Sequence, residues 1–186
     1  MFNLFGKKKT EEKKKKPVNI VKDLLNADLE TIWRIEDKNH FLIAMDGWLS
    51  RKSQFGEDID KLSDAEKVIY FNSQLEAEVN NGGFSQFFFN SSGKFAYRTV
   101  DSLTAIGALQ VAEILKKALQ AVGVNLPENW SERQELLNQV LTEDIEAKLN
   151  EFDSEFYLYP DNLEELNYGY IIANKSQFTE TAESSS

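Results

Sequence analysis

The 186-residue chain contains no cysteine and only one histidine, His40. The lack of cysteine excludes disulfide scaffolds, thiolate nucleophiles and cysteine-based zinc sites, and it mildly favours a cytoplasmic location. A single histidine excludes a histidine-rich metal site. His40 lies within an apolar run and has no readable partner, so its sequence context is more typical of a packed or helix-surface residue than of a general base.

The chain also lacks a long hydrophobic run. Residues 1–6 are too short for a signal peptide, position 2 is Phe2 and not the glycine needed for myristoylation, and no later segment is long enough to span a membrane. We therefore expect a cytoplasmic protein. Peripheral contact with the inner membrane surface is an alternative that depends on residues 1–16.

Basic residues are scarce outside the first 16 positions. Residues 1–16 hold seven lysines and two glutamates, for a net charge of +5, whereas residues 17–186 hold 14 basic and 29 acidic residues, for a net charge of −15. The acidity is concentrated in residues 126–186, which hold 3 basic and 14 acidic residues. Such a body repels nucleic acid phosphates, so we expect no direct nucleic acid binding by it and favour basic proteins as partners.

The basic N-terminal segment and the chain end differ from the body. Residues 1–17 are lysine-rich and stop at Pro17, which predicts a disordered arm. In an alternative, Phe2, Leu4 and Phe5 dip into an anionic membrane surface while the lysines hold the arm there. We expect one domain over residues 18–178 and a frayed tail over residues 179–186.

The body has a succession of helical patterns, which predicts an all-α, single compact multi-helix domain. Asp28 is a candidate N-cap for a densely apolar helix to Ser50, and Ser63 with Glu66 forms a capping box. Further helices are predicted over residues 95–106, 108–122, 131–150 and 163–174, with residues 153–159 interpreted as a helical continuation or, alternatively, a short strand.

Residues 78–93, EVNNGGFSQFFFNSSG, combine an adjacent pair of glycines and a third glycine with four phenylalanines and four carboxamides. The glycine pair predicts a helix end with positive φ and an immediate restart that places three phenylalanines on one buried face. The carboxamides either hydrogen-bond across this break or line a ligand pocket, and Glu78 is either solvated or accepts from them. The residues of this structural motif are Glu78, Asn80, Asn81, Gly82, Gly83, Phe84, Gln86, Phe87, Phe88 and Asn90.

No catalytic or metal-binding spacing is recognisable. Glu76, Glu78, Asn80, Asn81 and Gln86 are the best candidates for an enzyme site, but the chain has no phosphate-binding glycine loop and no EF-hand spacing. We therefore expect a protein that is not an enzyme and that binds no cofactor or metal ion.

The chain resembles the DNA-mimic protein family, a group of small acidic all-helical bacterial domains long known only as a domain of unknown function. The resemblance rests on residues 78–93, on the amphipathic helix that reaches Leu119, and on residues 152–157 leading into residues 170–174. The first block is specific, and the other two are weak alone. The resemblance covers roughly residues 29–178.

This resemblance implies binding, with carboxylates that imitate DNA phosphates at the DNA site of a transcription factor. Duplex DNA carries one negative charge per ~1.7 Å of axis, and helix carboxylates three or four residues apart lie about 5–6 Å from each other at Cβ. The candidate acidic face is the part of the chain with the highest density of acidic residues. It comprises Glu132, Glu135, Glu143, Asp144, Glu146, Glu151, Asp153, Glu155, Asp161, Glu164 and Glu165.

Three classes of function follow. The first is an acidic protein-binding module, such as a DNA mimic that occupies the DNA-binding site of a basic regulator, and the second is an immunity or antitoxin-type inhibitor of a basic nuclease. The third is a membrane-surface adaptor that uses residues 1–16. An ordinary solvated acidic surface is the plain alternative. The sequence names no partner and leaves open a homodimer and an arm folded back onto the acidic face.

Overall fold

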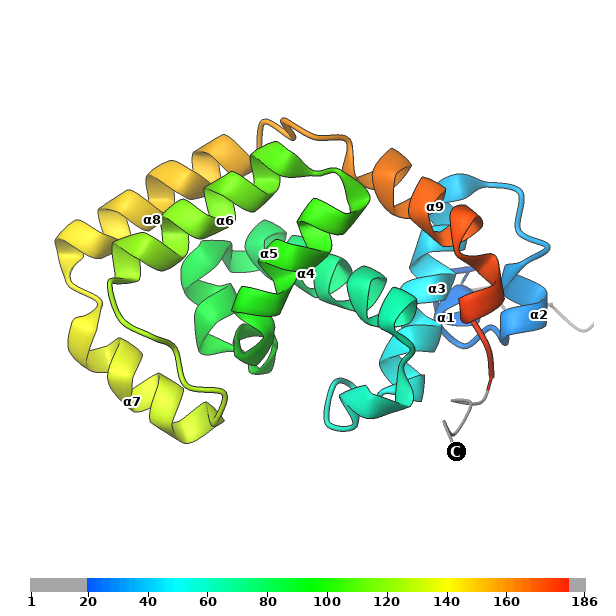
Figure 1. Ribbon diagram of the computed structural model, residues 1–186, viewed down its shortest axis with the longest axis horizontal. Helices are drawn as coiled ribbons and strands as arrows, with labels where there is room; N and C mark the ends of the chain where they lie inside the picture. Colours follow the sequence, from blue (N-terminus) through cyan, green and yellow to red (C-terminus); the bar gives the residue numbers. More distant parts are fainter. Residues whose placement is uncertain (1–19, 181–186) are drawn as a thin grey trace, which may run out of the picture.

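The computed structural model describes residues 20–180, and this part of the chain is built from helices with no strand (Figure 1). Short 3-10 turns occur at Ile59–Lys61, Ser91–Phe95 and Lys175–Gln177. The predicted all-α class is therefore confirmed. The α-helices are α1 (Ile20–Leu25), α2 (Leu29–Ile32), α3 (Lys38–Lys52), α4 (Asp64–Phe89), α5 (Ala96–Ile106), α6 (Leu109–Val122), α7 (Trp130–Val140), α8 (Glu143–Phe156) and α9 (Leu163–Ala173).

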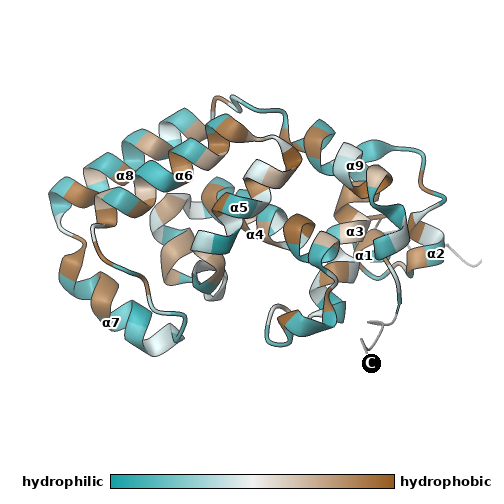
Figure 2. Cartoon of the chain, viewed as in Figure 1, coloured by the Kyte–Doolittle hydropathy of each residue, from teal (hydrophilic) through white to brown (hydrophobic). Residues whose placement is uncertain are grey.

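Two apolar clusters form the core, and the long helix α4 takes part in both. One cluster joins the second half of α4 to α5, α6, α7 and α8, and the other joins the first half of α4 to α2, α3 and α9. Val68 and Tyr170 pack against both clusters, which makes the core continuous. In Figure 2, helices such as α6 and α8 alternate hydrophobic with hydrophilic positions, as expected where one helix face is buried.

The prediction of a single helix from Asp28 to Ser50 is wrong. Asp28 does cap a helix by accepting from the backbone N–H of Thr31, but α2 ends after one turn. Asp37 then caps α3 by accepting from the N–H of His40. The prediction followed the apolar residues and missed that a second capping aspartate starts a new helix at the polar residues 36–40.

The helix predicted over residues 131–150 is also divided. Its first part is α7, capped by Asn129, and its second part is α8, capped by Thr142. Three carboxylates follow Thr142 in the first turn of α8, at Glu143, Asp144 and Glu146. Negative charge stabilises a helix N-terminus through the helix dipole, so these residues favour a start at this point. The continuation of α8 to Phe156 confirms the helical interpretation of residues 152–156 and excludes the strand.

The predicted capping box at the start of α4 is confirmed, and its glutamate also binds Thr179, near the end of the described residues. Glu66 is fully buried, accepts from the N–H of Ser63 at 2.8 Å and binds Lys52 Nζ with both carboxylate oxygens at 2.8 Å. The N–H of Thr179 donates to the same carboxylate at 3.1 Å. Thr179 and Glu180 are thus held by hydrogen bonds, unlike the frayed tail predicted from residue 179.

The predicted arm and most of the predicted tail cannot be compared with the structure. Residues 1–19 and 181–186 lie outside the described residues. Within residues 20–180, no helix combines the length and the apolar character needed to cross a membrane.

Candidate functional site

The stretch of residues 78–93 forms a sharp break within α4, as predicted. Gly82 and Gly83 depart from helical geometry, and Gly83 has φ of +75°. The chain then re-enters a helix in which Phe84, Phe87 and Phe88 are at most 1% exposed. Burying a phenylalanine contributes about 1.5–3 kcal/mol, so the second half of α4 is anchored in the larger apolar cluster.

Glu78 bridges the two halves of this break. Its Oε2 accepts from Gln86 Nε2 and from Asn90 Nδ2, both at 2.7 Å, and its Oε1 accepts from Ser92 Oγ at 3.3 Å. Of the two interpretations of Glu78 from the sequence, the solvated one is therefore wrong. The carboxylate instead satisfies the amides of the segment that follows the glycines, which fixes the angle of the turn.

The carboxamides of this motif do not converge on one ligand pocket. Gln86 and Asn90 are engaged by Glu78, Asn81 is exposed, and Asn80 donates to the hydroxyl of Tyr159 at 2.8 Å. Of these four amides, Asn80 is the one that lines the cavity of about 330 Å³ to which Glu76 also belongs. The enzyme-site candidates are therefore divided, with Glu78 and Gln86 bonded within the turn and Glu76 and Asn80 at a separate cavity.

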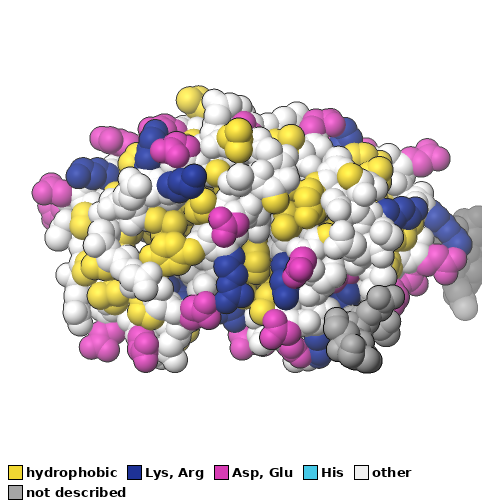
Figure 3. Space-filling view, in the orientation of Figure 1, with side chains coloured by type: hydrophobic (Ala, Val, Ile, Leu, Met, Phe, Trp, Pro, Cys, Tyr) yellow, Lys and Arg dark blue, Asp and Glu magenta, His cyan; other side chains and the backbone are white. Residues whose placement is uncertain are grey.

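The acidic candidates chosen by charge density fall into two separate groups. Helices α7 and α8 form one end of the molecule, whereas α9 packs against α3 and α4 towards the other end (Figure 1). Most of the predicted residues are exposed, and on the face drawn in Figure 3 acidic side chains are interspersed with basic and apolar ones. The exposed members are Glu132, Glu135, Glu143, Asp144, Glu146, Glu151, Glu155, Glu164 and Glu165.

Two predicted members of the acidic face serve the fold. Asp153 is buried and its Oδ1 accepts from the backbone N–H of Phe84 at 2.7 Å. The pKa of Asp153 is raised, because the effect of burial exceeds the opposite effect of the hydrogen bond from Phe84. Asp161 accepts from the N–H groups of Gln110 and Val111 at 2.7 and 2.9 Å, which satisfies donors at the start of α6 that have no partner within the helix. The assignment of Asp153 to the surface was wrong because charge density does not report burial.

Ion pairs reduce the free charge of two others. Glu155 lies 3.4 Å from Lys117 Nζ, and Glu165 pairs with Lys38. For Glu132, Glu135, Glu143, Asp144, Glu146 and Glu151 there is no ion pair with any residue between positions 20 and 180. We call these six residues the α7–α8 acidic group.

Arg133 is the residue that sequence reasoning missed in this region. It is fully buried, and its guanidinium donates to backbone carbonyls of Phe88 (2.9 Å) and Asn90 (2.8 Å) at the end of α4, and of Pro127 and Glu128 (both 2.9 Å). Burial lowers the pKa of Arg133. A cation suits the negative end of a helix dipole. Its charge is thus directed inward and does not neutralise the surface of α7.

A cavity of about 330 Å³ lies between α3, α4 and α9. Asp46, Glu76 and Glu164 line it, one from each helix. Asp46 and Glu76 were not among the acidic-face candidates, because they lie in mostly apolar stretches and only the packing of the helices brings them to Glu164. We call this the α3–α4–α9 cavity.

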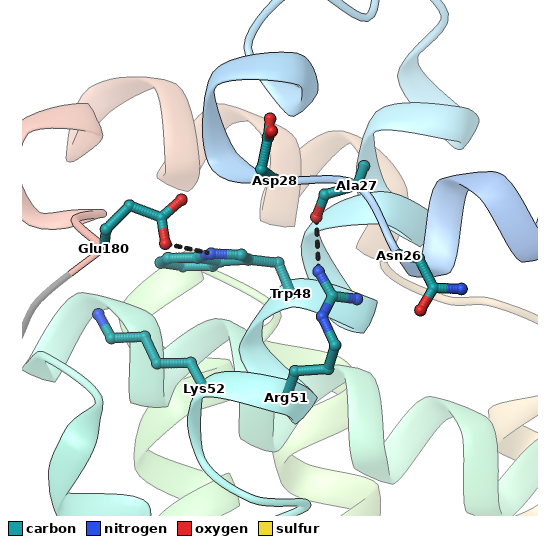
Figure 4. A pocket seen from close by; sticks show the side chains of 7 residues that line it. All are labelled: Asn26, Ala27, Asp28, Trp48, Arg51, Lys52 and Glu180. Carbon is teal, nitrogen blue, oxygen red and sulfur yellow. Dashed lines mark hydrogen bonds between the residues drawn. The ribbon is translucent and has the colours of Figure 1, made fainter.

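A second cavity, of about 400 Å³, lies beside Trp48 and is lined partly by basic residues (Figure 4). Lys52 Nζ lies 4.8 Å from the centre of the Trp48 ring, and Arg51 donates to the carbonyl of Ala27. The carboxylate of Glu180 accepts from the Trp48 indole N–H at 3.4 Å and from the backbone N–H of Leu29 at 3.1 Å. Glu180, the last described residue, therefore places its carboxylate among the basic and N–H groups that line this cavity.

In the described part of the chain, no group of three or more histidine, cysteine, aspartate or glutamate residues is placed to hold a metal ion. His40 is exposed on the first turn of α3, with Nδ1 3.6 Å from Asp37 Oδ1.

The model of the DMP19-like protein family matches residues 60–174, which is more than half of the chain and contains all three sequence blocks of the resemblance. Helices α1, α2 and α3 precede the matched range. No curated protein and no solved structure matches the chain significantly.

Proposed function

Because the chain belongs to the DMP19-like protein family, we propose that it is a non-enzymatic, acidic protein-binding module that occupies the DNA-binding site of a basic protein. The family is one of DNA mimics. The proposal assigns the contact to the α7–α8 acidic group. The acidic residues of α9 lie apart from this group.

The observation that carries the proposal is the unneutralised charge of α7 and α8. The six carboxylates of the α7–α8 acidic group are exposed and have no ion-pair partner in the described chain, and the charge of Arg133 is buried. Glu132 with Glu135, and Glu143 with Glu146, are three residues apart, so each pair spans about 5–6 Å at Cβ. Lys148 is the exposed basic residue of α8, so the surface charge of the two helices is predominantly negative, and such charge steers a basic partner and raises its rate of association.

The same carboxylates also have a structural effect. Glu132 lies in the first turn of α7, and Glu143, Asp144 and Glu146 lie in the first turn of α8, where each carboxylate contributes about 0.3–1 kcal/mol to the helix. Stabilisation of the two helix N-termini does not by itself explain why all four of these acidic residues are exposed and have no ion-pair partner in the described chain. A test of binding must nevertheless control for folding.

The test is capture of partners from an extract of the native host at low and high salt, followed by mass spectrometry. The test variant carries Glu143→Gln, Asp144→Asn, Glu146→Gln and Glu151→Gln, and it leaves the buried Asp153 intact. The matched control also loses four exposed acids, all outside α7 and α8. Its substitutions are Glu36→Gln, Glu57→Gln, Asp101→Asn and Glu113→Gln.

We expect the wild type and the control to capture a basic DNA-binding protein at low salt and to release it at high salt, because screening weakens exposed charge pairs. The test variant should lose the capture while circular dichroism shows the same helix content. Equal capture by the test variant and the control would overturn the assignment of the contact to α8. The identity of the captured protein separates a regulator from a nuclease.

A further inference from the structure

The α3–α4–α9 cavity combines a charged end with an apolar wall. Asp46, Glu76 and Glu164 supply carboxylates, and Leu42, Ile43 and Ala77 line the same cavity with apolar surface. Glu164 is exposed and marks the mouth of the cavity, while Asp46 and Glu76 are partly buried. A cavity of this kind suits a ligand that has an apolar stem and a cationic head.

The carboxylates of the cavity are not paired with a cation in the described chain, although the charge of Glu164 helps to raise the pKa of Lys38. None of the three forms an ion pair with a residue between positions 20 and 180, and the neighbouring Lys38 on α3 is engaged by Glu165 on α9. Oδ1 of Asp46 is buried and accepts no hydrogen bond from the described residues. Buried polar atoms normally have a partner, so this oxygen is an unused acceptor on a residue of the cavity wall.

The electrostatics of the cavity agree with a cationic ligand. Burial raises the pKa of Asp46 to about 6, against a hydrogen bond from Gln74 that lowers it. Burial also raises the pKa of Glu76, and the charges of Glu164 and Asp46 raise it further. The charged groups that face the cavity are thus acidic on all three helices, apart from Lys38, and a bound cation would favour their ionised forms.

We infer that the α3–α4–α9 cavity binds the side chain of an arginine from the basic protein partner, with the guanidinium at Asp46 and Glu76 and the aliphatic stem along Leu42 and Ile43. The inference rests on the proposed function for the nature of the partner. A guanidinium presents several N–H donors in a fixed plane, which suits carboxylates on different helices. The carboxylates are not grouped for a metal ion within the described residues, which favours a larger organic cation.

The site would give the protein a contact that surface charge alone does not provide. The α7–α8 acidic group attracts any basic surface, whereas a cavity with an apolar wall accepts one side chain of a particular length and shape. Asp46 belongs to α3, which precedes the range matched by the family model. The complete cavity therefore depends on a part of this chain outside that range.

The test uses the purified full-length protein and a small probe, N-acetyl-arginine methylamide, followed by NMR of backbone amides. The isosteric and uncharged N-acetyl-citrulline methylamide is the control ligand. We expect saturable shifts confined to amides of α3, α4 and α9 around the cavity, and much weaker binding of the citrulline probe. Asp46→Asn and Glu76→Gln should each weaken arginine binding by at least about tenfold.

The double variant Glu143→Gln and Glu146→Gln is the matched control and should bind the arginine probe like wild type. Binding should also weaken as pH falls from 7 to 5, because protonation removes the charge of Asp46. Equal shifts with citrulline, unchanged affinity in Asp46→Asn, or shifts spread over α7 and α8 would each overturn the inference.

The two proposals fail separately. The arginine titration contains no protein partner, so its failure overturns the cavity site and leaves the capture experiment on α7 and α8 unaffected. Failure of the capture experiment with saturable, Asp46-dependent arginine binding overturns the proposed function and supports the cavity site.

Discussion

The carboxylate of Asp153 occupies the space into which a side chain on Gly83 would project. Its Oδ1 accepts a 2.7 Å hydrogen bond from the N–H of Phe84, and a Cβ on Gly83 would collide with its Oδ2. Gly83 also has φ of +75°, a conformation that L side chains rarely adopt. Glycine at this position is therefore required both by its own backbone and by the packing of α8 against α4.

We predict that Gly83→Ala lowers the free energy of unfolding by about 2–6 kcal/mol, because the extended, positive-φ backbone of Gly83 costs other residues about 1–3 kcal/mol and overpacking adds about 1–3 kcal/mol. Urea denaturation followed by circular dichroism measures the change. Gly107→Ala is the control for a positive φ without a collision, since Gly107 has φ of +84° in the left-handed helical region and a Cβ there would meet no atom within 4 Å. Equal losses in the two variants would show that the contact with Asp153 is unimportant.

The hydrogen bonds of Glu78 predict a stability loss for the isosteric variant. In Glu78→Gln, an amide NH₂ replaces one of two oxygens that accept from Gln86, Asn90 and Ser92. Loss of hydrogen bonds to a charged acceptor should lower the free energy of unfolding by about 1–3 kcal/mol. Glu135→Gln, on the exposed surface of α7, is the control and should change stability by less than about 0.5 kcal/mol in the same denaturation experiment. A similar effect of both variants would contradict the bridging role of Glu78.

Loss of the buried cation of Arg133 should strongly lower the free energy of unfolding. Arg133→Met keeps much of the side-chain volume but leaves carbonyls of α4 and of residues 127–128 without donors, so we expect a loss of about 3–5 kcal/mol. Thermal and urea unfolding measure this loss. Arg98→Met is the control, because Arg98 pairs with Glu128 at the surface and such pairs contribute about 0–1 kcal/mol. A small loss in Arg133→Met would mean that water replaces the guanidinium.

The raised pKa of Asp46 predicts how the free energy of unfolding changes with pH. Its pKa is about 6 in the folded protein and near the ordinary aspartate value of 3.8 when unfolded, so between these values the native state binds more protons than the unfolded chain. The contribution of Asp46 to the free energy of unfolding therefore falls as pH rises from about 4 to about 6. Asp46→Asn removes this loss, and we expect it to stabilise the protein by about 1–3 kcal/mol at pH 7.

The measurement is urea denaturation of wild type and Asp46→Asn at pH 4 and pH 7. The two proteins should have nearly equal stability at pH 4, where Asp46 is protonated in the folded state. A difference that is the same at both pH values would contradict the burial of an ionised Asp46. Glu151→Gln, an exposed substitution on α8, is the control for changes in net charge.

Interactions between residues close in sequence were predictable because they depend on local backbone geometry. The capping box of Ser63 and Glu66, the helix break at Gly83 and the buried face of Phe84, Phe87 and Phe88 all appear as expected. The same local reasoning failed at Asp37 and Thr142, where a short polar side chain starts a new helix inside a long apolar pattern. Apolar periodicity continues across such breaks, so it does not reveal them.

The sequence by itself determined the all-α class, the helix break at the glycine pair and the acidic character of the C-terminal third, since these depend on composition and on contacts within a few residues. Only the tertiary structure decided which charges are free to act. It buried Asp153 against Phe84, 69 residues away, directed Arg133 to carbonyls of α4, and brought Asp46, Glu76 and Glu164 to one cavity. The physical reason is that burial and pairing of a charge depend on helices far apart in the chain, which composition and periodicity do not specify.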